Sequence, residues 1–138
     1  MNAPDTVTVV LADAHESYSA GLARAITDHP GLELVGVAGD GREALALILR
    51  ERPDVAVLDI RLPGLDGFTV SERLTACREA IETRVVLLTA LPDAAQYGRA
   101  RSVGASDCLE KGAPREQICD ALVNAAASHA DARHATRS

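Results

Sequence analysis

Four polar residues of this sequence each follow a short apolar segment, and their side chains are those that phosphoryl transfer requires. They are Asp13, Asp59, Thr89 and Lys111. Asp59 can accept a phosphoryl group on its carboxylate, and Asp13 can help to hold a divalent cation, which prefers oxygen ligands. The hydroxyl of Thr89 and the ammonium of Lys111 can neutralise phosphoryl oxygens as charge redistributes during transfer. These residue types therefore predict phosphoryl transfer onto a carboxylate.

The apolar segments before these residues predict strands that would bring them together. The predicted strands are residues 7–12, 32–38, 55–58, 84–88 and 107–110. The first, third and fourth are nearly continuous Val and Leu, which is typical of parallel strands covered on both faces. The second fits a position nearer an edge, and the fifth is short. Ligands of open parallel sheets bind at the carboxyl ends of the strands, so the four polar residues are expected on one rim.

Helical patterns alternate with the strands. The predicted helices are residues 17–28, 42–52, 68–80, 93–103 and 116–127, with Asp66 and Asp93 as N-caps of the third and fourth. Five strands alternating with five helices predict an α/β fold, with a parallel sheet between two helix layers and right-handed crossovers. Residues 128–138 are polar and aperiodic, so they are expected to be a fraying helix end or a linker.

Length and composition favour one globular domain. The chain has 138 residues and a formal charge of −6, which disfavours nucleic acid as a direct partner. No apolar run approaches the roughly 20 residues of a membrane span, and the N-terminus does not resemble a signal peptide. The three cysteines, Cys77, Cys108 and Cys119, have no metal-binding or disulfide spacing and are expected as small buried residues. A reduced, cytoplasmic protein with no membrane contact is expected.

The stretches "LDIRLPGLDG", "LLTA" and "LEKG", which follow "LADA", resemble the receiver domain of two-component response regulators. The resemblance covers residues 6 to about 127. It implies a flavodoxin-like (βα)5 three-layer sandwich with a five-stranded parallel sheet of order 2-1-3-4-5. In this interpretation residues 1–127 form the receiver domain, and residues 128–138 form a C-terminal tail or linker.

The resemblance also implies a role for each candidate residue. Asp59 would accept a phosphoryl group from the phosphohistidine of a histidine kinase, and Thr89 and Lys111 would contact the phosphoryl oxygens. Asp13, Asp59 and the backbone carbonyl of Arg61 would hold Mg2+. The implied function is a regulatory switch rather than an enzyme, which controls an output such as transcription through conformational change or dimerisation.

One departure from the family pattern lies at Ala14. Receiver domains usually carry two adjacent acids after the first strand, followed by apolar residues four and eight positions after the second acid. Counting from Ala14 reaches Tyr18 and Leu22, so Asp13 fills the first acid position and Ala14 the second. Because the second acid usually binds the metal directly, Mg2+ binding is expected to be weakened.

Two neighbouring side chains could replace the missing carboxylate, but neither is the expected ligand. Glu16 fits better as an acid in the first turn of a helix, and the imidazole of His15 is a poor match for hard Mg2+. A second departure lies at Cys108, where receivers generally place an aromatic residue whose rotamer follows the threonine hydroxyl. Cysteine has too little bulk to report in that way.

Two other functions remain open from the sequence. With Ala14 in the second acid position, the chain could be a pseudo-receiver, a binding module that works without Mg2+-dependent phosphorylation. A phosphatase using Asp59 as nucleophile is disfavoured, because such enzymes commonly carry a proton-donating acid where Arg61 stands.

The opening "ADAHESYSAGL" resembles receivers of the LuxR-type helix-turn-helix (NarL/FixJ-like) class. The expected partners are a histidine kinase and a second copy of the chain. DNA would be contacted only through an output domain that this sequence lacks. The chain is therefore expected to be either a single-domain regulator or, as favoured here, the receiver part of a longer transcription factor.

Overall fold

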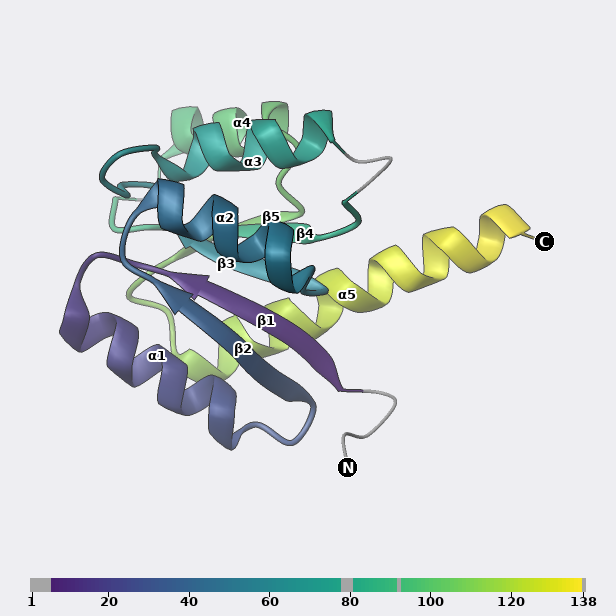
Figure 1. The fold of residues 1–138 in the computed structure, drawn as a ribbon, viewed down its shortest axis with the longest axis horizontal. Helices are drawn as coiled ribbons and strands as arrows, with labels where there is room; N and C mark the ends of the chain where they lie inside the picture. The colour runs from purple at the N-terminus through teal and green to yellow at the C-terminus, as the bar shows by residue number, and fades with distance from the viewer. Residues whose placement is uncertain (1–5, 78–80, 92, 138) are drawn as a thin grey trace.

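The computed structural model describes residues 6–77, 81–91 and 93–137, and for residues 128–137 only the main chain. Its five parallel strands lie in the order β2-β1-β3-β4-β5 (Figure 1). The strands are β1 (Val7–Ala12), β2 (Leu32–Ala38), β3 (Val55–Asp59), β4 (Arg84–Thr89) and β5 (Asp107–Glu110). The helices are α1 (Glu16–Asp28), α2 (Gly41–Glu51), α3 (Gly67–Ala76), α4 (Ala94–Ser102) and α5 (Arg115–Arg137). The predicted flavodoxin-like (βα)5 sandwich, including its strand order, is confirmed.

The sheet is buried on both faces because successive strand residues point to opposite sides. The face that includes Val10 and Leu87 packs on α2, α3 and α4, whereas the face that includes Val9 and Leu88 packs on α1 and α5. Figure 1 shows these two helix layers on either side of the sheet. All four of these side chains are fully buried, which explains why the central strands are apolar without alternation.

Three helices begin at an aspartate whose carboxylate accepts a hydrogen bond from the backbone N–H three residues on. The pairs are Asp40 with Glu43, Asp66 with Thr69, and Asp93 with Gln96, each at 2.8 Å. Such caps satisfy N–H groups that the helix itself leaves unpaired. The predicted N-caps Asp66 and Asp93 are thereby confirmed.

The turn from β3 into α3 is held tightly against the end of the strand. The N–H of Gly67 donates to the carbonyl of Ile60 at 2.8 Å. A side chain at Gly67 would bring its Cβ within 2.5 Å of the Asp59 carbonyl oxygen, so this position requires glycine. Gly64, in the same turn, has a φ of +80°, which glycine adopts without steric cost. The carboxylate of Asp59 therefore stands at the entrance of a fixed turn.

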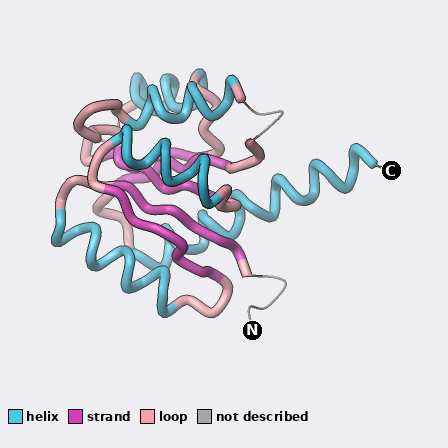
Figure 2. Tube along the Cα trace, viewed as in Figure 1, coloured by secondary structure: helices cyan, strands magenta, loops and turns pink. Residues whose placement is uncertain are grey.

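Two predicted helix ends differ from the structure. Helix α3 ends at Ala76, before the predicted end at Ala80, and residues 78–80 lie outside the described residues. Helix α5 continues ten residues past the predicted end at Ala127, to Arg137, and extends beyond the sheet in Figure 2. Alanine and arginine favour helix intrinsically, but they leave no apolar stripe from which the extension could be predicted.

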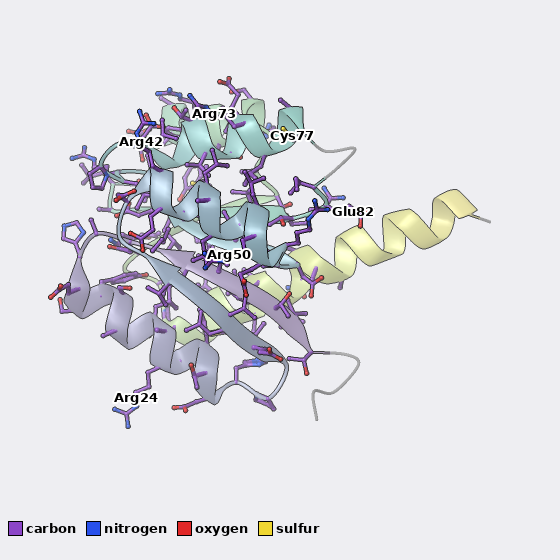
Figure 3. The ribbon with its side chains drawn as sticks, viewed as in Figure 1. Arg24, Arg42, Arg50, Arg73, Cys77 and Glu82 are labelled. Atoms are coloured by element: carbon purple, nitrogen blue, oxygen red, sulfur yellow. The ribbon has the colours of Figure 1, made fainter. Side chains whose placement is uncertain are left out.

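The three cysteines differ in their exposure to solvent. Cys119 is buried as predicted and Cys108 is half-buried, but Cys77 is exposed at the end of α3, so its predicted burial is wrong (Figure 3). Figure 3 also shows Arg24 pointing away from the body of the protein on α1. Among the helices that the structure describes, none is long and apolar enough to cross a membrane.

Candidate functional site

Asp13 and Asp59 lie side by side because β1 and β3 are paired neighbours in the sheet. Each residue is only 3% exposed. In each carboxylate, Oδ1 accepts a hydrogen bond from the backbone N–H two residues on, from His15 at 2.7 Å and from Arg61 at 3.0 Å. Burying a carboxylate costs folding free energy unless the group is paired and hydrogen-bonded. The backbone N–H groups just after the two strands supply one hydrogen bond to each carboxylate.

Lys111 supplies the countercharge for both carboxylates. Its Nζ lies 2.7 Å from Asp13 Oδ2 and 3.2 Å from Asp59 Oδ2, and its side chain is 12% exposed. The backbone N–H of Lys111 donates to the carbonyl of Thr89 at 2.8 Å, which fixes the start of the side chain beside β4. Burial lowers the pKa of Lys111, but the hydrogen bond to Asp13 and the charge of Asp59 outweigh it, so the pKa is raised overall.

The ring of Tyr18, on α1, packs against the ammonium of Lys111. Lys111 Nζ is 4.3 Å from the centre of the Tyr18 ring, and the Arg115 guanidinium carbon is 5.4 Å from it. Both are cation–π distances. Burial raises the pKa of the Tyr18 phenol, against the opposing charges of Lys111 and Arg115. From the sequence, Tyr18 is only an apolar position of the helix, because nothing in the spacing separates a core aromatic from one beside a site.

Thr89 lies on the same rim, at the end of β4, and is 3% exposed. Its hydroxyl donates to the side-chain oxygen of Gln96 in the first turn of α4 and accepts from the N–H of Leu91 at 3.2 Å. The threonine is thus linked directly to α4. The contact of Gln96 with the rim is not predictable from the sequence, because α4 carries too few apolar residues to indicate which of its side chains face the rim.

The possible metal ligands form a mixed set. One possible ligand atom comes from each of three residues, Asp13, His15 and Asp59. These three atoms lie within 4.8 Å of one another. Two buried carboxylates suit a hard divalent cation, and the backbone of Arg61 adjoins Asp59. Ala14 is exposed and has no donor to offer. The donor set therefore fits a divalent metal ion, with one carboxylate fewer than receiver domains usually provide.

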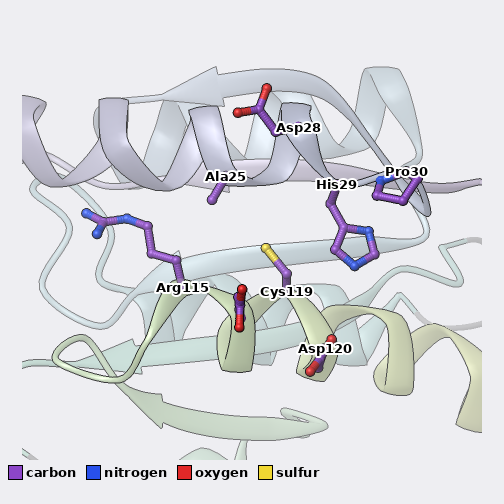
Figure 4. Close-up of a pocket in the computed structure, with 8 residues that line it drawn as sticks. Ala25, Asp28, His29, Pro30, Arg115, Cys119 and Asp120 are labelled. Atoms are coloured by element: carbon purple, nitrogen blue, oxygen red, sulfur yellow. The ribbon is translucent and has the colours of Figure 1, made fainter.

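A separate pocket of about 430 Å3 lies between the C-terminal part of α1 and the first turns of α5 (Figure 4). Its lining includes His29, Arg115 and Cys119. None of the four polar residues predicted for the rim lines this pocket. Arg115 connects the two regions, because its guanidinium also lies near the Tyr18 ring.

The fold and the acidic rim define an α/β domain that carries two carboxylates and a lysine at the carboxyl ends of its strands. The chain belongs to the family described as the response regulator receiver domain, whose model matches residues 9–123. Receiver domains generally bind Mg2+ at an acidic pocket, and Asp13 and Asp59 form such a pocket here. The similarities give no support to the alternative of a pseudo-receiver.

Individual proteins similar to this chain are also response regulators. The chain is 37% identical over 123 residues to the Probable transcriptional regulatory protein NarL of Mycobacterium tuberculosis (strain CDC 1551 / Oshkosh), covering 89% of this chain and 56% of that protein. It therefore spans about half the length of that relative. The structure of the NarL receiver domain from Mycobacterium tuberculosis superposes with a TM-score of 0.85 at 36% identity, covering 89% of this chain and 98% of that one.

A LuxR-family two-component response regulator from Aurantimonas sp. SI85-9A1 is similar as well. Its crystal structure gives a TM-score of 0.82 at 28% identity, with 89% of this chain and 86% of that chain covered. The predicted resemblance to the NarL/LuxR class is therefore confirmed.

Proposed function

We propose that this chain is a phosphoacceptor switch in which Asp59 receives a phosphoryl group from a histidine kinase. The observation that supports it best is the position of Asp59 itself. The carboxylate is buried at a strand end, with its Oδ2 3.2 Å from Lys111 Nζ, and Thr89 ends the neighbouring strand β4. The site thus combines a nucleophile with a cation and a hydroxyl that suit phosphoryl oxygens.

In the proposed transfer, a carboxylate oxygen of Asp59 forms a bond to phosphorus as the bond between phosphorus and the kinase imidazole breaks. The electron pair of that bond stays on the imidazole nitrogen, and the product is an aspartyl phosphate. Asp13, Asp59 and the carbonyl of Arg61 would hold a divalent cation, which would offset the negative charge of the phosphoryl oxygens. Lys111 would then pair with a phosphoryl oxygen, and the Thr89 hydroxyl would leave Gln96 to donate to another.

The wider role is part of the same proposal. Residues 1–127 act as the receiver domain and residues 128–138 as a C-terminal tail or linker, in a longer regulator of transcription that works in the cytoplasm. The partners are a histidine kinase and a second copy of the chain. DNA is contacted only by an attached output domain, in keeping with the charge of −6 on this chain.

Intact-mass measurement after incubation with a small-molecule phosphodonor and a divalent cation tests the proposal. One added phosphoryl group is expected on the unmodified sequence and none on Asp59→Asn. Asp66→Asn is the matched control, because asparagine also caps helices and the change lies in the same turn. Failure of the unmodified chain to gain mass, or persistence of the adduct in Asp59→Asn, would contradict the proposal.

A further inference from the structure

The donor atoms around Asp59 do not form the oxygen-only set that Mg2+ prefers. Ala14 contributes nothing, and the third side chain among the clustered donors is the imidazole of His15. His15 Nδ1 lies 3.4 Å from Asp13 Oδ1 and 3.9 Å from Asp59 Oδ2. Two ligands bonded tetrahedrally to one Zn2+-sized ion at about 2.0–2.2 Å are about 3.3–3.6 Å apart, so the first distance already suits a shared ion.

The imidazole has no other structural task among the described contacts. His15 is the N-cap of α1, and its side chain makes no capping hydrogen bond. Preferred N-caps are Ser, Thr, Asp and Asn, because their short side chains reach the helix N–H groups. His15 instead holds Asp13 through its backbone N–H at 2.7 Å and directs its imidazole nitrogen toward the two carboxylates.

Lys111 and a metal ion at this position would not compete for every oxygen. Lys111 contacts Oδ2 of both aspartates, whereas the short approach of His15 is to Oδ1 of Asp13. An ion held by His15 Nδ1 and Asp13 Oδ1 leaves the Asp13 Oδ2 ion pair with Lys111 in place.

We propose that His15 is a metal ligand of this pocket, and that the resulting oxygen–nitrogen site selects a borderline first-row divalent cation, such as Co2+ or Zn2+, over Mg2+. Imidazole suits such ions, whereas Mg2+ takes oxygen ligands and gives up its water reluctantly. The inference concerns the pocket of the proposed function, but it requires no phosphoryl transfer.

Metal titrations without a phosphodonor test the ligand directly. Co2+ binding is followed by visible absorption, and Mg2+ binding by competition against Co2+. His15→Ala is expected to weaken Co2+ binding at least about tenfold, since losing even an outer-shell partner of a ligand costs 10–100-fold, and to leave Mg2+ binding unchanged. His29→Gln, at the other end of α1, is the matched control and should bind both ions as the unmodified chain does.

A second measurement separates a ligand from a merely nearby residue. Long-range 1H–15N spectra of the histidine rings are recorded with and without diamagnetic Zn2+. Zn2+ should shift the ring 15N resonances of His15 and leave those of His29 unchanged. The double variant Ala14→Asp/His15→Ala should bind Mg2+ more tightly than the unmodified chain, because it restores an oxygen ligand.

Equal Co2+ affinity in the unmodified chain and in His15→Ala would overturn the proposal, as would His15 ring signals that Zn2+ does not move. Either result would assign the ion to the carboxylates alone. These titrations are independent of the mass measurement on Asp59. A chain that binds Co2+ through His15 but gains no phosphoryl group would contradict the proposed function only, and the reverse result would contradict this inference only.

Discussion

At the scale of single residues, the rim depends on one ammonium that serves two carboxylates. Asp13 and Asp59 are both nearly inaccessible to solvent, and Lys111 lies within 3.2 Å of each. Removing one partner of a buried ion pair leaves the other charge uncompensated, which destabilises the fold more than the pair itself stabilises it. Lys111 should therefore contribute to folding stability as well as to phosphoryl binding.

Lys111→Met is expected to lower the free energy of unfolding at pH 8 by about 1–3 kcal/mol, below the 3–5 kcal/mol of a fully buried pair because Lys111 is partly exposed. The pKa of Lys111 is raised in the folded state. Its stabilising effect is therefore fully present below the unfolded pKa of about 10.4 and is lost as pH rises through the folded value.

Urea denaturation of both proteins between pH 8 and pH 11 provides the measurement. The stability difference between them should shrink toward the alkaline end of that range. Arg24→Met, which removes an exposed charge on α1, is the control and should change stability little. A difference that stays constant up to pH 11 would show that the methionine variant loses packing rather than an ion pair.

At the scale of elements, α4 is the helix with the least burial on the sheet. Ala100 is its one buried residue among those described. Its C-terminal end is held from α3, where the hydroxyls of Ser71 and Thr75 both donate to the carbonyl of Val103 at 3.0 Å. Its first turn is tied to the rim through Gln96 and Thr89. A change at Thr89 would therefore act on one end of α4 while the other end stays anchored.

Gln96→Ala is expected to loosen the first turn of α4. A hydrogen bond worth about 1 kcal/mol corresponds to roughly fivefold faster amide exchange in a locally opening segment. Hydrogen–deuterium exchange measured by mass spectrometry should show this increase in peptides that cover α4. Gln117→Ala, an exposed residue in the first turn of α5, should leave those peptides unchanged. If both variants exchange alike over α4, the contact to Thr89 does not hold the helix.

At the scale of the whole molecule, the fold could be predicted from the sequence more completely than the contacts within the site. Continuous apolar strands that alternate with helices were enough to predict a parallel sheet with Asp13, Asp59, Thr89 and Lys111 on one rim, whereas the strand order came from the resemblance to receiver domains. The orientation of His15 was not predictable, because it depends on the rotamer of one exposed side chain at a helix start. The tail after Ala127 could be predicted only as a helix end or a linker, because helix propensity without an apolar stripe leaves no periodic pattern that separates the two.

The contact of the Tyr18 ring with Lys111 and Arg115 gives the protein an optical probe at its own site. The chain has no tryptophan and two tyrosines, so tyrosine emission is not masked. Tyr97 is 37% exposed on α4, and Tyr97→Phe would leave Tyr18 as the sole emitter. A ligand that draws Lys111 away from the ring should then change the emission intensity, and stopped-flow fluorescence would follow that event in real time without any label. Unchanged emission on saturation with a ligand known to bind would mean that Lys111 stays on the ring.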